Sequence, residues 1–188
     1  MLSPIFILQG CISTADDNVS FPAPAAEDPS YNSSYRSSTA NYQVIENFET
    51  RFIVHSTILT KEFLQSFAKR YQTIFNEPQP ILGEATSKLG FFVTIFTPDR
   101  EMSDLDDERL WNIQLQQEQG PLLKPDLVRK MKPKERWSPF FPAISKWSKE
   151  YLILFDSPTQ AISTIDTVRG TNTKLILSNP DGQVKIHW

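Results

Sequence analysis

The spacing of apolar and polar positions changes several times along the chain, and each change predicts an element. Residues 48–59 alternate large apolar or β-branched side chains with charged ones, which predicts a strand. Residues 61–76 place their apolar side chains at helical spacing, and Thr60 before them is a residue type that caps helices, so we expect a long helix here. This helix should end before Pro78 and Pro80.

Further strands are predicted along the rest of the chain. Residues 88–98 form an apolar run, which predicts a strand buried on both faces. Residues 151–156 form another apolar run and predict the core of a further strand. Residues 111–116 alternate and predict a half-exposed strand, with a helix as the alternative, whereas residues 125–131 are expected to form a short helix. Residues 173–188 contain the turn sequence Asn-Pro-Asp-Gly between two alternating runs, which predicts a terminal hairpin.

Together these elements predict one globular domain over residues 42–188. Its expected fold class is α+β, with a mostly antiparallel sheet of about six strands and one long helix packed on one face. Residues 12–41 are rich in Ser, Ala, Pro, Asp and Asn, have few aliphatic residues and show no sustained period. Such a segment buries too little apolar surface to offset its ordering entropy, so we expect a disordered linker.

The first residues have a different pattern. The chain opens with the apolar stretch Leu2–Leu8 and reaches its single cysteine in the sequence Leu8-Gln9-Gly10-Cys11. This sequence resembles the lipobox of bacterial lipoproteins. The resemblance implies that residues 1–10 are a signal-peptide remnant, that the Cys11 thiol carries diacylglycerol, and that acyl chains such as palmitate hold the protein in a membrane.

The same resemblance implies that residues 11–41 are the lipid anchor and the linker. It also implies that the protein lies in the bacterial cell envelope and faces the periplasm or the cell exterior. Signal peptides begin with basic residues, and the first basic residue here is Arg36, so we expect the true start upstream. In the alternative interpretation, Leu2–Leu8 is an edge strand and Cys11 a buried thiol of a cytoplasmic protein.

Composition narrows the possible partners. The chain has 188 residues, of which 39% are hydrophobic and 12% aromatic, enough for a substantial core. Its net charge of −3 gives no whole-molecule attraction for nucleic acid, and we expect no nucleic-acid partner. One cysteine cannot form an internal disulfide, and no run reaches the roughly 18 apolar residues that a membrane-spanning helix needs.

Few residues offer catalytic chemistry. The two histidines, His55 and His187, lie far apart in predicted strands, and the chain lacks the common phosphate-loop, dinucleotide, zinc and nucleophile motifs. We therefore expect no cofactor, no metal and no catalytic residue, although enzymatic activity stays open. The alternatives are an envelope hydrolase using carboxylates such as Asp99, Asp104 or Asp156, and a carrier with an apolar cavity behind residues 61–76. The acidic run 99–108 lacks the spacing of a calcium loop and is expected to be solvated.

We expect a working surface, if the domain has one, in the basic and aromatic segment of residues 124–151. Its candidate binding residues are Arg129, Lys130, Lys132, Lys134, Arg136 and Trp137. Cations beside aromatic rings suit anionic lipid headgroups or an envelope polymer. In the alternative interpretation, the lysines are merely solvated and the aromatic residues pack on the sheet. In either case, we expect Trp147 and Tyr151 to anchor the segment to the core. The sequence thus predicts a lipid-anchored envelope protein with a non-catalytic binding or structural role.

Overall fold

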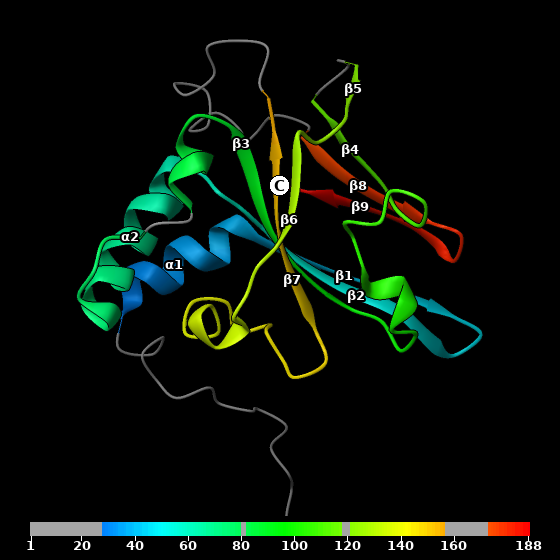
Figure 1. Ribbon diagram of the computed structural model, residues 1–188, viewed down its shortest axis with the longest axis horizontal. Coiled ribbons are helices and arrows are strands. Elements are labelled where there is room, and N and C mark those ends of the chain that lie inside the picture. Colours follow the sequence, from blue (N-terminus) through cyan, green and yellow to red (C-terminus); the bar gives the residue numbers. More distant parts are fainter. Residues whose placement is uncertain (1–27, 80–81, 118–120, 157–172) are drawn as a thin grey trace, which may run out of the picture.

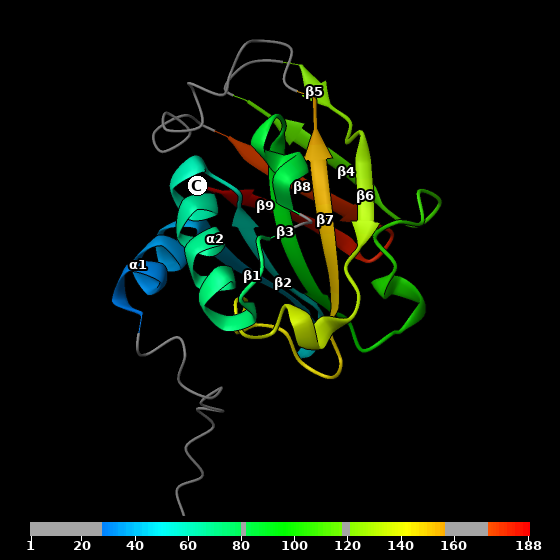
Figure 2. The ribbon, with the colours of Figure 1, turned by 60° about the vertical axis from the view of Figure 1, so that its left-hand side comes forward.

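The computed structural model describes residues 28–79, 82–117, 121–156 and 173–188, which build three layers (Figure 1). A five-stranded sheet forms the middle layer, with two helices on one face and a four-stranded sheet on the other. Figure 2 shows the helices in front of the central sheet. Every strand pair in both sheets is antiparallel. The α+β class and the antiparallel pairing are therefore confirmed.

The five-stranded sheet has the order β1-β2-β3-β7-β6. Its strands are β1 (Thr39–Glu46), β2 (Glu49–Ile58), β3 (Leu89–Phe96), β7 (Lys149–Phe155) and β6 (Leu127–Lys130). The strands predicted over residues 48–59, 88–98 and 151–156 correspond to β2, β3 and β7. All but the last residue of β3 are buried, as expected for a strand covered on both faces.

The four-stranded sheet has the order β5-β4-β8-β9. Its strands are β5 (Leu122–Leu123), β4 (Asn112–Gln116), β8 (Lys174–Asn179) and β9 (Gly182–His187). The predicted strand at 111–116 and the predicted terminal hairpin are confirmed. Alternate residues of this sheet, including Ile113 and Leu177, pack with Trp111, directly before β4, against β2, β3 and β7 and form the core between the two sheets.

The helical layer consists of α1 (Pro29–Ser38) and α2 (Lys61–Phe75). Helix α2 begins as predicted, because the Thr60 hydroxyl accepts a hydrogen bond from the Phe63 amide, and it ends at Asn76 in the left-handed conformation. Its apolar face packs on β3 and β7 together with aromatic residues of the 131–148 loop, which joins β6 to β7. The large members of this second core are Tyr31, Phe63, Phe67, Tyr71, Phe92, Trp137, Phe140 and Phe141.

The structure adds a second sheet to the predicted one and corrects two other expectations. The described residues form nine strands, with five in the central sheet and four in a second sheet, which covers the face of β3 and β7 opposite the helices. Residues 127–130 form β6 and not part of a short helix, since their backbone pairs with β7. Helix α1 and the first residues of β1 also lie inside the predicted linker. Buried Tyr31 fixes α1 to the core, so the linker cannot extend to residue 41.

The predicted signal-peptide remnant, Cys11 and the linker up to residue 27 lie outside the described residues. Among the residues that the structure describes, no helix is long and apolar enough to cross a bilayer.

Candidate functional site

Three chain segments meet at one end of the five-stranded sheet. Strand β3 ends at Phe96 where β7 begins, because Ile95 pairs with Lys149. Strand β6 also ends there, because Lys130 pairs with Tyr151. Each segment carries basic residues just at or beyond its strand, so the register brings together cations that are far apart in the sequence.

A groove of about 550 Å³ lies at this junction, and we call it the basic groove. Its cationic lining residues are Arg100, Lys130, Lys132, Lys134, Lys146 and Lys149. Thr97, Ser103, Met131, Pro133, Trp147 and Ser148 complete the lining with Glu150. Six lining cations, set against the lining carboxylate of Glu150 and the adjacent carboxylate of Asp104, give the groove a positive field although the whole chain has a net charge of −3.

Three of the cations are available to a ligand. Arg100, Lys132 and Lys146 are exposed, and none of them has a carboxylate within ion-pairing distance among the described residues. Each keeps its charge in contact with water, so an incoming anion would meet a full positive charge without first breaking an ion pair.

Lys134 and Glu150 shape the floor of the groove. The Lys134 ammonium donates hydrogen bonds to the carbonyl oxygens of Ser145 (2.8 Å) and Ser148 (2.7 Å), and its Nζ lies 3.9 Å from Glu150 Oε1. The Ser148 hydroxyl donates to the same carboxylate at 2.5 Å. Glu150 is buried, and burial raises the pKa of its carboxyl group. Lys134 is therefore mainly a structural residue that holds the 131–148 loop in place.

Lys130 and Lys149 share one carboxylate. Their ammonium groups lie 3.1 Å and 2.7 Å from Asp104 Oδ1, which also accepts a hydrogen bond from the Tyr151 hydroxyl at 3.3 Å. The hydrogen bond from Lys149, with a smaller contribution from Lys130, lowers the pKa of the Asp104 carboxyl group. One carboxylate between two ammonium groups leaves a net positive charge on this wall.

The exposed ring of Trp147 adds an apolar surface to the groove. The side chain is 55% exposed, and two cations approach its ring: Arg100 Cζ lies 5.7 Å from the ring centroid and Lys146 Nζ lies 4.8 Å away. Both distances are within the range of cation–π contacts. The ring thus holds two of the available cations near the mouth of the groove while presenting its own face to solvent.

Comparison with protein-family models, curated proteins and solved structures gives no match.

The structure divides the predicted binding residues into two groups. Lys130, Lys132 and Lys134 line the basic groove. Arg129 points away from it and pairs with Glu84, with 3.1 Å between Nη1 and Oε1. Neighbouring side chains of a strand point to opposite faces, and therefore Arg129 and Lys130 cannot act on one surface.

The other two predicted residues also lie outside the groove. Arg136 forms an ion pair with Glu77 and stacks over the rings of Tyr71 and Phe75, so it fixes the 131–148 loop to the end of α2. The prediction that Trp137 belongs to a binding surface is wrong, because its side chain is 1% exposed within the helix-side core.

Sequence reasoning missed half of the groove. Arg100 follows the predicted strand at 88–98 but lies beside an acidic run, and Lys146 and Lys149 flank Trp147, which was expected to anchor the core. Tyr151 is buried as predicted, whereas Trp147 is exposed. The signal that could have found this site is the sequence Lys-Trp-Ser-Lys at residues 146–149, where a strand begins.

The structure separates two of the candidate catalytic carboxylates, Asp104 and Asp156. Asp104 binds Lys149 at the start of β7, while Asp156 follows the end of β7 and pairs with Lys88 at 2.8 Å. A strand of this length separates the two carboxylates by roughly 20 Å, far beyond the spacing of glycosidase acids. Asp99 accepts a hydrogen bond from the Glu101 amide, so its carboxylate stabilises the local turn.

The histidines are also separated. His55 lies on β2 with Nδ1 2.7 Å from the Asn41 side-chain oxygen, and burial lowers the pKa of its imidazole. His187 lies on β9 of the other sheet. Within the described ranges, no three His, Cys, Asp or Glu residues are grouped as metal ligands would be.

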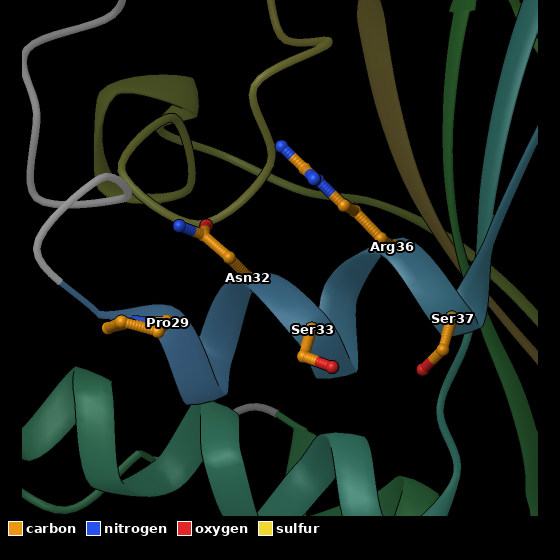
Figure 3. A pocket seen from close by; sticks show the side chains of 5 residues that line it. All are labelled: Pro29, Asn32, Ser33, Arg36 and Ser37. Atoms are coloured by element: carbon orange, nitrogen blue, oxygen red, sulfur yellow. The ribbon is translucent and has the colours of Figure 1, made fainter.

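Two further features of the described residues offer little site chemistry. Aromatic rings fill the space between α2 and the sheet, where Phe92 and Phe141 stack with 3.6 Å between centroids, so this layer does not favour an apolar carrier. A second hollow runs along α1 (Figure 3), where Asn32 and Arg36 point away from α2. The described residues that line this hollow all belong to α1, and Arg36 is the only charged residue among them. The hollow therefore offers few groups that could bind a ligand.

Proposed function

We propose that this protein is a non-catalytic binding module of a bacterial cell envelope, held at a membrane through lipidated Cys11, whose folded domain binds anionic groups in the basic groove. The observation that carries the proposal is the lining of that groove, with six cations and one buried carboxylate. The tether rests on the lipobox-like sequence ending at Cys11.

The geometry of the groove favours binding of phosphate or carboxylate groups over their chemical conversion. Its cations act as donors and point charges, and its carboxylates are already engaged: Asp104 by Lys130 and Lys149, and Glu150 by Ser148. A cation in such an exposed position contributes on the order of 1 kcal/mol to the binding of an anionic surface, so several together give useful but salt-sensitive affinity.

Titration with inorganic tripolyphosphate at low salt tests the groove. We expect heat of binding in isothermal titration calorimetry with the wild-type chain, and affinity about ten- to a hundredfold lower for the double variant Lys132→Glu/Lys146→Glu. These two lysines have no ion-pair partner in the described part of the chain, so their reversal should leave the fold intact.

Lys61→Glu/Lys185→Glu is the matched control, because it makes the same change of charge at exposed positions on α2 and β9, outside the groove. An equal loss of affinity in this control would mean that the affinity for tripolyphosphate depends only on the net charge of the protein. The assignment of the groove would then fail.

Labelling with a fatty-acid analogue tests the tether. In a bacterial host, from a gene that supplies a complete signal peptide, we expect the wild-type chain to take up the label and to sediment with membranes, whereas Cys11→Ala should do neither. Label on the Cys11→Ala chain, or none on the wild-type chain, would contradict the anchor.

A further inference from the structure

The turn between β1 and β2 exposes a large apolar side chain in an unfavourable backbone conformation. Glu46 pairs with Glu49, so Asn47 and Phe48 form a two-residue turn, with φ values of 52° and 65°. This is the pattern of a type I′ turn, in which glycine is preferred at the second position. A bulky residue with positive φ is uncommon. Phe48 nevertheless occupies this position, and its relative solvent exposure of 105% means that it is fully exposed.

The strand register places this turn at the same end of the sheet as the basic groove. Strand β2 begins at Glu49, but its pairing with β3 starts only at Ile53, opposite Phe96. The hairpin therefore projects beyond the end of β3 by four residues, or about 13 Å. Figures 1 and 2 both show the β1–β2 turn and the 131–148 loop toward the lower end of the molecule, with β5 toward the upper end.

The hairpin carries little net charge of its own. The Arg51 guanidinium lies 3.0 Å from a carboxylate oxygen of Glu46 and 3.9 Å from one of Glu49. Ile45, which is 60% exposed, extends the apolar surface of Phe48 along β1. The tip is thus an apolar projection with partly neutralised flanks, at the same end of the sheet as the basic groove with its lysines and exposed tryptophan.

The folded domain begins on the same side. Asp28, directly before α1, lies 3.9 Å from Arg70, whose guanidinium also donates to the carbonyl oxygen of Pro139 in the 131–148 loop at 3.3 Å. Tyr31 donates to the neighbouring carbonyl of Phe140. The chain that leads from Cys11 therefore enters the domain beside the loop that forms the basic groove. Only sixteen residues lie between Cys11 and Asp28, so they can separate the two by at most about 60 Å.

We infer that this end of the molecule is a membrane-docking face, and that its partner is the anionic surface of the membrane in which Cys11 is anchored. The exposed rings of Phe48 and Trp147 enter the interfacial layer, where aromatic side chains are favoured, and the lysines of the basic groove lie against phosphate headgroups. This inference rests on the proposed function and names the ligand of the same groove. It also gives Phe48, which lies outside the groove, a binding role.

Vesicle sedimentation with the full unacylated chain, Cys11→Ala, tests the inference without help from the lipid. We expect binding to vesicles of phosphatidylglycerol in phosphatidylcholine and not to pure phosphatidylcholine. Phe48→Gly and Trp147→Ser should each weaken binding about tenfold, because each removes an apolar side chain from the interface. Leu122→Ser is the matched control, since Leu122 is 51% exposed on β5 at the opposite end, and it should bind normally.

The choice of glycine keeps the test independent of folding. Glycine suits the second position of the β1–β2 turn better than phenylalanine, so Phe48→Gly should unfold at the same temperature as the parent or at a higher one. We expect this variant to lose vesicle binding while keeping its full affinity for tripolyphosphate.

Two outcomes would overturn the inference, and they are distinguishable. In the first outcome, tripolyphosphate binds, but the parent does not sediment with anionic vesicles, or Phe48→Gly and Trp147→Ser sediment as the parent does. The groove would then bind a soluble polyanion, and only the membrane-docking face would be contradicted. If neither tripolyphosphate nor anionic vesicles bind the parent, the proposed function falls as well.

Discussion

Replacing Trp137 with alanine is expected to lower the free energy of unfolding by about 3–5 kcal/mol, as is typical for truncation of a large buried ring. The Trp137 ring is 1% exposed and packs between Phe67 and Phe92, with centroid distances of 6.5 Å and 6.0 Å. Alanine would leave a cavity in the layer that joins α2, the sheet and the 131–148 loop. Urea unfolding followed by far-ultraviolet circular dichroism measures the change.

Trp147→Ala is the control in the same loop. Because the Trp147 side chain is 55% exposed, its removal should change the free energy of unfolding by no more than about 0.5 kcal/mol. Trp137→Phe should fall between the two, since it keeps an aromatic ring and removes an indole N–H that has no acceptor among the described residues. Equal effects of Trp137→Ala and Trp147→Ala on stability would contradict the burial that separates these two residues.

The contrast between these tryptophans shows where sequence patterns stop being informative. Periodicity identifies β2, α2 and β3 well, because each is long and its apolar positions repeat with the period of its own backbone. Periodicity cannot predict which loop residues are buried, because the apolar positions of a loop do not repeat with a regular spacing. Both tryptophans lie in one aromatic, basic segment, and only the packing of Phe140 and Phe141 against α2 decides that one ring is buried and the other exposed.

The same limit applies to the site. The local density of lysine indicates the segment that contains Lys130, Lys132 and Lys134, and these three residues line the basic groove. Density along the chain does not show, however, on which side of the sheet each residue lies. Arg129 is excluded by alternation along β6, and Arg100 is included by the antiparallel register of β3 and β7. The first fact requires residues 127–130 to be a strand and not part of the predicted helix, and the second requires the pairing of two segments that are far apart in the sequence.

Tyr31→Ala is expected to destabilise the domain by about 3–5 kcal/mol, although Tyr31 lies in the segment whose composition predicts a linker. The ring is 2% exposed and contacts Phe63 and Phe140, with Arg70 Cζ 4.7 Å from its centroid. The hydroxyl donates a buried hydrogen bond of 2.8 Å to the Phe140 carbonyl oxygen. Burial raises the pKa of this hydroxyl well above its ordinary value, so it stays a neutral donor.

Tyr31→Phe separates the hydrogen bond from the packing. It keeps the ring but leaves the Phe140 carbonyl without this donor, which should cost about 1–3 kcal/mol. Tyr42→Ala serves as the control, because Tyr42 is 41% exposed on the edge strand β1 and should change stability little. A short polar helix gains its stability from tertiary packing, and a single aromatic residue supplies much of it here. If Tyr31→Ala unfolds at the same urea concentration as the parent chain, α1 does not belong to the folded domain, and the chain from Cys11 enters the domain after residue 38.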